Sequence, residues 1–184
     1  MMRFTSANRI RLDRAAGLRL MSRRILASAA FLALAGCAFH RALPPYETPA
    51  PRAPAMKIRT TAYTHTESDH TRYGACNALG GHLKCGAINS AAADWSRFPA
   101  GTVFRVVATG EVYEVDDIGW MLAGTNTIDL YKPTRRDMNA WGVRRVTIEI
   151  LQWGDVTTSY RVLKPREKFR HVKRMTKQIE QRYL

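Results

Sequence analysis

The fold of this chain is decided by residues 112–131, which read VYEVDDIGWMLAGTNTIDLY. Two runs in it, 112–115 and 127–131, are rich in β-branched and aromatic residues, as is typical of β-strands. Glycines between the two runs indicate turns. Carboxylates mark both runs, because Asp117 closely follows the first and Asp129 interrupts the second. The stretch therefore predicts two short strands that carry acidic side chains.

Asp129 is the unusual residue of this stretch. In a strand, Ile128 and Leu130 share one face, while Asp129 and Tyr131 share the other. A carboxyl beside an aromatic ring on a half-buried strand loses hydration, and this loss raises its pKa. A raised pKa is what a general acid needs near neutral pH. The alternative is a structural Asp that bonds to the backbone of the fold.

Further strand candidates have the same composition and are separated by turns that contain Gly or Pro. They are Ile58–Thr64, Ala87–Asn89, Val103–Ala108 and Val143–Leu151, with Thr157–Leu163 as a seventh candidate. One short helix is expected at Arg135–Trp141, capped by Thr134 and ended by Gly142. Six or seven short strands with one helix predict a mainly β fold, a small barrel without open sheet edges.

The N-terminal region is typical of an exported lipoprotein. Arg23 and Arg24 precede an apolar run, Ile25–Leu34, which is too short to span a bilayer. The run leads into Leu34-Ala35-Gly36-Cys37, which resembles a bacterial lipobox, so Cys37 is the expected lipidation site. We therefore expect residues 1–36 to be a lipoprotein signal peptide, with Met21 as an alternative start.

The remaining chain divides by composition. Residues 37–56 are rich in Pro and Ala and predict an extended tether. Residues 57–163 hold the strand candidates, and residues 164–184 form a basic tail. Apolar residues recur at helical spacing in this tail, which predicts a basic amphipathic helix. The helix either packs on the barrel or binds anionic lipid or wall polymer.

The formal net charge of +14 is concentrated at the two ends of the chain. Residues 1–36 hold seven Arg and one Asp, and residues 164–184 hold eight Lys or Arg and two Glu. Such basic regions suggest anionic partners. Because the chain is expected to be exported and its middle is near neutral, nucleic acid is not an expected partner.

Cys76 and Cys85 remain once Cys37 is assigned. An oxidising compartment permits a disulfide between them. Free thiols are one alternative, and a Cys/His metal site is another, although the spacing fits no compact zinc pattern. No cofactor motif is present, and we expect neither a cofactor nor a metal.

Several motifs in order resemble the three-aspartate (3D) domain family, over roughly residues 57–153. This family has a double-psi β-barrel and includes the C-terminal part of membrane-bound lytic transglycosylase A. The matching motifs are Thr61-Ala62-Tyr63, Asp94 with Pro99-Ala100-Gly101-Thr102, Asp117-x-Gly119 with Gly124, Ile128-Asp129-Leu130-Tyr131, and Trp141-Gly142-Val143. The chain departs from the family at residues 118–124, where the usual Thr and Lys are missing.

The resemblance implies a six-stranded double-psi β-barrel that cleaves peptidoglycan. Asp129 would be the acid/base at the bond between N-acetylmuramic acid and N-acetylglucosamine, giving 1,6-anhydromuramyl ends, and Asp117 would support it. Tyr63, Trp120 and Tyr131 would stack on sugars, with core packing as their alternative. Asp94, Gly119 and Gly124 would be structural.

The resemblance and the N-terminal region together place the protein in the cell envelope. Cys37 would anchor it in the outer side of the cytoplasmic membrane or in the outer membrane, facing the periplasm. Its expected partner is the glycan strand of peptidoglycan. The altered residues 118–124 leave a second interpretation, a non-catalytic peptidoglycan-binding lipoprotein or a partner module for another wall enzyme.

Overall fold

A computed structural model describes residues 42–68 and 70–184. The predicted signal peptide, 1–36, and the predicted lipidation site, Cys37, lie outside the described residues. Leu43–Leu184 form one compact unit. This unit contains every strand of the barrel and both hydrophobic clusters, so we expect it to fold by itself.

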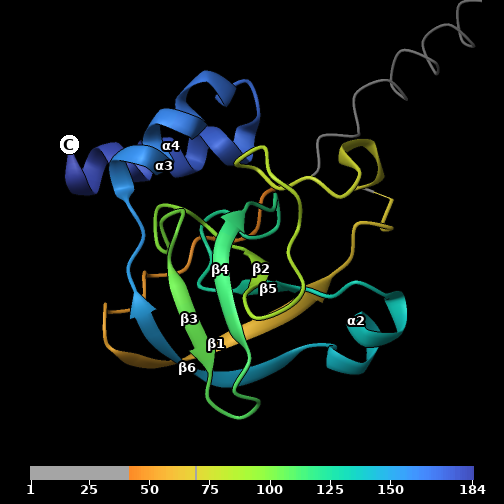
Figure 1. Ribbon diagram of the computed structural model, residues 1–184. Helices are drawn as coiled ribbons and strands as arrows, with labels where there is room; N and C mark the ends of the chain where they lie inside the picture. The colour runs from red at the N-terminus through yellow and green to blue at the C-terminus, as the bar shows by residue number, and fades with distance from the viewer. Residues whose placement is uncertain (1–41, 69) are drawn as a thin grey trace, which may run out of the picture. The chain divides into compact units, whose positions relative to one another are not determined.

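Six strands close into a barrel in the order β1-β5-β2-β4-β3-β6 (Figure 1). Two pairs of neighbours, β1/β5 and β2/β4, are parallel, and the other four pairs are antiparallel. Closure pairs every strand on both sides, as the sequence predicted for a small mainly β barrel. The strands are β1 (Ala55–Tyr63), β2 (Asn89–Ala92), β3 (Val103–Val106), β4 (Val112–Asp117), β5 (Ile128–Tyr131) and β6 (Arg144–Gln152).

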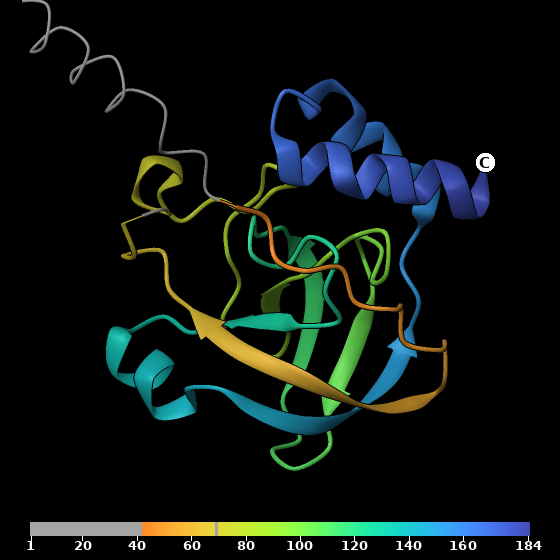
Figure 2. The same ribbon diagram turned by 180° about the vertical axis from the view of Figure 1, so that it is seen from behind.

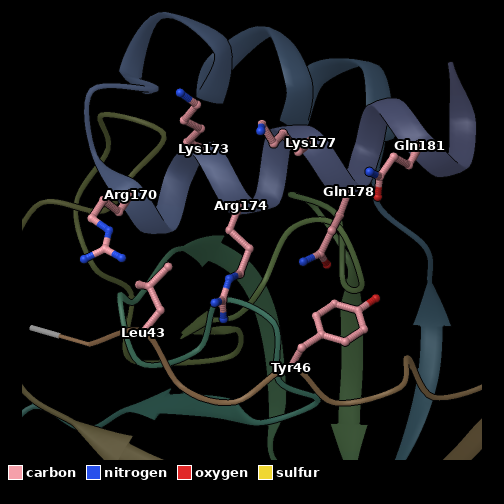
Figure 3. A pocket seen from close by; sticks show the side chains of 8 residues that line it. All are labelled: Leu43, Tyr46, Arg170, Lys173, Arg174, Lys177, Gln178 and Gln181. Atoms are coloured by element: carbon pink, nitrogen blue, oxygen red, sulfur yellow. The ribbon is translucent and has the colours of Figure 1, made fainter.

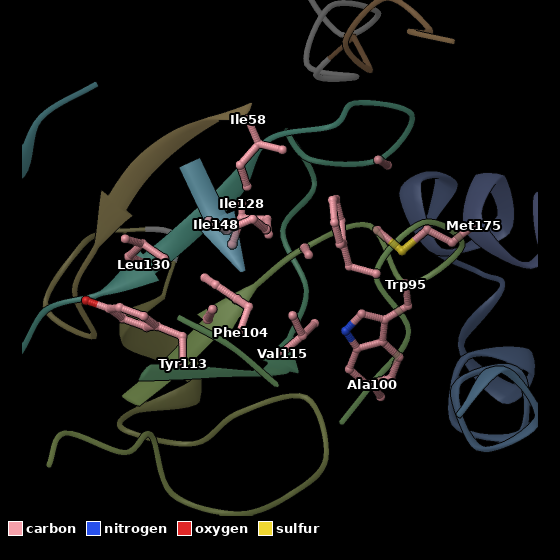
Figure 4. Packing of buried hydrophobic residues seen from close by; sticks show 14 of the residues in the cluster. Ile58, Trp95, Ala100, Phe104, Tyr113, Val115, Ile128, Leu130, Ile148 and Met175 are labelled. Atoms are coloured by element: carbon pink, nitrogen blue, oxygen red, sulfur yellow. The ribbon is translucent and has the colours of Figure 1, made fainter. Parts of the chain in front are cut away.

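Alternate residues of the strands fill the inside of the barrel. Ile128 and Leu130 of β5 are both fully buried in the main hydrophobic cluster, whereas Asp129 between them points the other way and is partly exposed. Trp95, also fully buried, extends this cluster to the region beneath the C-terminal helix, where it lies next to Met175 (Figure 4). The predicted alternation of residues 128–131 is therefore confirmed.

The predicted helix at Arg135–Trp141 is confirmed as α2 (Arg135–Trp141). Thr134 accepts a hydrogen bond from the backbone N–H of Asp137, and this cap fixes the start of the helix. Gly142 ends it with a φ of 62°, which a residue with a side chain rarely adopts. Local signals at both ends thus specify this helix.

The strand predicted as a seventh candidate, Thr157–Leu163, is wrong. These residues belong to α3 (Val156–Leu163), because the side chain of Asp155 accepts a hydrogen bond from the N–H of Thr158 and caps a helix there. Val156, Tyr160 and Leu163 follow helical rather than strand spacing, and Leu163 is fully buried. The structure also has two 3-10 turns, η1 (Thr71–Tyr73) and η2 (Lys164–Arg166).

The predicted basic C-terminal helix is confirmed, but it is shorter than residues 164–184, because α4 spans Arg170–Tyr183. Its apolar residues Val172, Met175 and Ile179 are buried in the same cluster as the barrel core. Figures 1 and 2 show α3 and α4 side by side over one end of the barrel. Among the described residues, none of the helices is both long enough and apolar enough to cross a bilayer.

The strand boundaries differ from prediction at the start of the barrel. β1 begins at Ala55, two residues before the expected boundary at 57, and β2 lies at Asn89–Ala92 rather than Ala87–Asn89. Part of the expected tether also contacts the barrel unit. The N–H of Glu47 donates to the carbonyl of Gly124 over 2.8 Å, and the N–H of Ala50 donates to Oδ1 of Asn126 over 2.9 Å.

We predict that Gly154→Ala strongly destabilises the barrel. A Cβ at this position would overlap the backbone carbonyl oxygens of Pro99 and Ala100, which cannot move without shifting the turn that precedes β3. Urea unfolding should show a loss of roughly 3 kcal/mol or more.

Gly86→Ala is the matched control, because nothing lies within 4 Å of a Cβ built there. Its free energy of unfolding should stay within about 0.5 kcal/mol of the parent. Equal stability of the two variants would show that the backbone around Gly154 is not packed as described.

Candidate functional site

Asp117 and Asp129 lie in one row across neighbouring strands. Ala92 of β2 pairs with Asp129 of β5 on one side and with Asp117 of β4 on the other. Thr61 of β1 pairs with Asp129 and extends the row. Two strand spacings separate the two acids, roughly 10 Å along the sheet. Directly opposed residues point to the same face, and the small side chain of Ala92 leaves space between them.

A β-bulge aims Asp117 into this row. Ala91 pairs with Val115, but the next residue, Ala92, pairs with Asp117, so Asp116 is an extra residue in β4. Such a bulge turns the following side chain toward another direction. Val115 is consequently buried in the main core, while Asp117 joins Asp129 on the other face.

Asp117 is almost completely buried, with 6 % of its surface exposed. Its carboxylate accepts hydrogen bonds from the hydroxyl of Tyr63 (3.0 Å) and the N–H of Ile118 (2.9 Å). Burial raises the pKa of Asp117, although these two hydrogen bonds and the nearby His70 act in the opposite direction. Burial and the Asp117 carboxylate raise the pKa of Tyr63 well above its usual value, so this hydroxyl remains a donor.

Asp129 is the more accessible carboxyl of the pair. Its Oδ1 accepts a hydrogen bond of 2.6 Å from the hydroxyl of Thr61. Desolvation raises the pKa of Asp129 to about 7, the negative charges of Glu67 and Asp117 add to this rise, and the Thr61 hydrogen bond opposes it. At neutral pH Asp129 therefore exists in both protonation states, and it can give and take a proton.

The predicted sugar-stacking tyrosines lie beside the acids. Tyr63 and Tyr131 are paired in register on β1 and β5, with ring centroids 5.6 Å apart. Both are mostly buried, and they form a second hydrophobic cluster with Ala92 and Leu122. Tyr63 and Tyr131 therefore pack against each other and form the apolar floor of the site. Trp120 lies in the segment between β4 and β5 and is partly exposed.

Sequence reasoning missed Thr61, His65, Glu67 and His70 as members of this site. Nδ1 of His65 lies 2.8 Å from the hydroxyl of Tyr131, and the ring of His70 lies 5.6 Å from that of Tyr63. Strand alternation was the available signal for Thr61, because it shares a face with Tyr63 two residues later. The others lie in the irregular segment that follows β1, whose path no local pattern predicts.

Asp94, Gly119 and Gly124 lie outside the row. Asp94 is fully buried, and its carboxylate accepts hydrogen bonds from the N–H and hydroxyl of Ser96 and from the N–H of Gly124. It thereby joins the turn after β2 to the segment before β5. Gly124 has a φ of +85°, and a Cβ there would press on Arg174. A Cβ on Gly119 would contact the side chain of Leu122.

Asp116 faces a different set of partners. It is fully buried and accepts hydrogen bonds from Asn77 (3.0 Å) and Ser90 (2.8 Å), and Nζ of Lys84 lies 3.3 Å away. Burial raises its pKa, while the bond from Ser90 and the charge of Lys84 oppose this. Asp116 therefore ties the segment between β1 and β2 to β4.

Of the alternatives for Cys76 and Cys85, the structure has two free, exposed thiols. In the described part of the chain, no three side chains of His, Cys, Asp or Glu gather closely enough to hold a metal ion. Two cavities, of about 450 and 360 Å³, are lined by residues other than Asp117 and Asp129.

No protein-family model matches the chain, and no curated protein is significantly similar to it. The chemistry of the site must therefore be argued from its own residues. The feature that calls for an explanation is Asp129, a partly exposed carboxyl whose pKa is raised to about 7 beside a second buried carboxyl.

We predict that Asp129→Asn stabilises the protein in a pH-dependent way. A pKa raised in the folded state means that the fold disfavours the ionised form, so the parent loses stability as pH rises from about 4 to about 7. The neutral amide avoids this loss. Chemical unfolding should show no difference near pH 3 and a gain of about 2–4 kcal/mol at pH 8.

Glu149→Gln, an equal charge change on the outside of β6, is the control and should alter stability by less than about 1 kcal/mol. A gain for Asp129→Asn that is the same at both pH values would contradict the raised pKa.

Proposed function

We propose that the protein is a lytic transglycosylase that cleaves the glycan strands of peptidoglycan, with Asp129 as its acid/base. The observation that carries this proposal is the pKa of Asp129, raised to about 7 at a partly exposed strand position in the same row as Asp117. A group that titrates near neutral pH can serve first as an acid and then as a base in one reaction cycle.

The strand topology also supports the proposed family. A closed six-stranded barrel with two parallel pairs agrees with the double-psi β-barrel that the resemblance implies. The motif residues Thr61 and Tyr63 lie on β1, and Asp129 and Tyr131 lie on its neighbour β5. Asp117 lies at the end of β4, which β2 separates from β5. Three of these residues, Thr61, Asp117 and Asp129, lie in the row described above, and this placement supports the resemblance.

The proposed reaction needs one carboxyl because the nucleophile belongs to the substrate. Protonated Asp129 donates its proton to the glycosidic oxygen as the bond from this oxygen to C1 of the muramic acid breaks. The resulting carboxylate takes the proton of the C6 hydroxyl of the same sugar, whose oxygen bonds to C1. The products are a 1,6-anhydromuramyl end and a free hydroxyl on the leaving sugar, and no water is consumed. Ordinary glycosidases use two carboxyls at a defined separation.

The neighbours of Asp129 tune this chemistry. Burial raises the pKa of Asp129, and the charges of Glu67 and Asp117 add to this rise, which favours the acid form before the first proton transfer. The hydroxyl of Thr61 donates to the Asp129 carboxylate and holds its orientation. Tyr63 and Tyr131 limit the access of water from the side of the barrel, because both rings are mostly buried.

One observation favours the second interpretation, a wall-binding lipoprotein without catalysis. The carboxylate of Asp117 already accepts hydrogen bonds from the hydroxyl of Tyr63 and the N–H of Ile118. In this interpretation the barrel holds glycan strands or another wall enzyme, and the acids are structural. Both interpretations place the protein in the cell envelope, anchored through Cys37.

Digestion of purified peptidoglycan tests the proposal. The chain that begins at Ala42 should release fragments with 1,6-anhydromuramyl ends, identified by mass spectrometry. Asp129→Asn should reduce the rate at least about 100-fold, because general acid–base groups contribute that much or more. Since only protonated Asp129 starts the reaction, kcat/KM should fall as pH rises above about 7.

Reducing ends among the products would contradict the transglycosylase and indicate hydrolysis. If no product forms but the protein co-sediments with the wall, the binding interpretation is correct. Glu149→Gln serves as the activity control because Glu149 pairs with Ala55 at the start of β1, whereas Asp129 pairs with Thr61 near its end.

We predict that Thr61→Val moves the alkaline limb of the pH profile to higher pH. The variant removes the hydrogen bond that favours the ionised form of Asp129, so the pKa of Asp129 rises. The shift should be about one pH unit, since a hydrogen bond to a charged group is worth roughly 1.5 kcal/mol.

Thr147→Val, at an exposed position of β6, should leave the limb in place. An equal loss of kcat/KM at every pH in Thr61→Val, with no movement of the limb, would mean that Thr61 does not act through the pKa of Asp129.

A further inference from the structure

A groove of about 450 Å³ runs between α4 and the segment that leads into the barrel (Figure 3). Basic side chains of α4 form one wall, and the apolar part of the entering segment forms the other. We propose that this groove binds the phosphate of anionic phospholipid headgroups and holds this face of the protein against the membrane. The lining residues are Leu43, Tyr46, Arg170, Lys173, Arg174, Lys177, Gln178 and Gln181.

Three cations of the groove form no ion pair with the residues that the structure describes. Arg170, Lys173 and Lys177 are exposed, and within residues 42–68 and 70–184 none of them takes part in an ion pair. By contrast, Lys164 at the other side of the helix pair contacts both Glu167 and Glu180. The charge of the groove is therefore available to an external anion.

Arg174 has a structural role in the groove, because its guanidinium is bound to backbone carbonyls. Its Nη1 donates to the backbone carbonyls of Pro44 (2.6 Å) and Ala123 (3.2 Å). Figure 3 shows this side chain reaching from α4 down to the entering segment, between Leu43 and Tyr46. The contact fixes the two walls relative to each other, so the free cations are held along one edge.

The proposed contact with the membrane is electrostatic and does not insert α4 into the bilayer. The apolar stripe of α4, with Val172, Met175 and Ile179, is buried in the barrel core and cannot enter a bilayer. The exposed side of α4 carries Arg170, Lys173 and Lys177. Cations outside a bilayer are attracted by anionic lipids without entering the hydrocarbon.

The position of the groove along the chain favours a lipid headgroup over a wall polymer as its ligand. Leu43, which lines the groove, comes six residues after Cys37, the expected lipidation site. Six residues span at most about 21 Å when extended. The groove thus stays close to the segment by which the chain is expected to meet the membrane, within the length of a short tether.

Vesicle flotation tests the proposal with the chain that begins at Ala42, which excludes the apolar run. The parent should bind phosphatidylcholine vesicles that contain phosphatidylglycerol and should not bind phosphatidylcholine alone. Arg170→Gln, Lys173→Gln and Lys177→Gln together should weaken binding about 100-fold, since each cation near an anionic surface adds roughly a five-fold factor. Lys173→Gln with Lys177→Gln should weaken it about 25-fold.

Lys57→Gln, Arg136→Gln and Arg145→Gln together are the matched control. These exposed cations lie on β1, α2 and β6, so the variant has the same net charge as the triple variant of the groove. Its affinity should change less than about five-fold, because charges beyond a Debye length are screened. Thermal unfolding checks that all variants are folded.

Equal losses in the two triple variants would overturn the proposal, because they would show attraction by net charge alone. Binding of polyglutamate in preference to phosphatidylglycerol vesicles would also overturn it and assign the groove to a carboxylate polymer of the wall. The assay has no enzymatic readout, so its result is independent of the proposed transglycosylase activity.

Discussion

The pairing of β2 with both β4 and β5 is the constraint on which the site depends. Ala92 lies between Asp117 and Asp129, and only a small residue leaves the two carboxyls a common space. The bulge at Asp116 is part of the same constraint, because without the extra residue Asp117 would not face Ala92. β2, whose four residues are all buried, thus fixes the position of Asp117 relative to Asp129. This position lets the charge of Asp117 contribute to the raised pKa of Asp129.

The site is supported from the end of the barrel that α4 covers. The indole N–H of Trp95 donates to the backbone carbonyl of Asp117, and Trp95 lies in the core that Met175 of α4 completes. The carboxylate of Asp94 joins the same turn to Gly124, whose carbonyl also accepts from Glu47. Loss of α4 would therefore loosen β4 at the residue whose charge raises the pKa of Asp129.

Local features could be predicted from the sequence, and pairings between distant segments could not. Thr134 and Gly142 specify the ends of α2, and the alternation of Ile128, Asp129 and Leu130 specifies the faces of β5. The β-branched residues of Thr157–Leu163 resemble those of a strand, but the cap at Asp155 specifies a helix. The register that aligns Asp117 with Asp129, and the contacts of Glu47 and Ala50 with the barrel, join residues far apart in sequence and leave no local pattern.

Barrel closure has a consequence for the order in which the chain can fold. β1 pairs with β5 and β6, and the hydroxyl of Thr60 bonds to the carbonyl of Arg144, which lies 84 residues later. Contacts of such long range slow folding, because the loop between them must be closed first. β1 therefore cannot pair with β5 and β6 until these later strands have been synthesised, so the barrel closes late. For the export that we propose, late closure would keep the chain unfolded for longer.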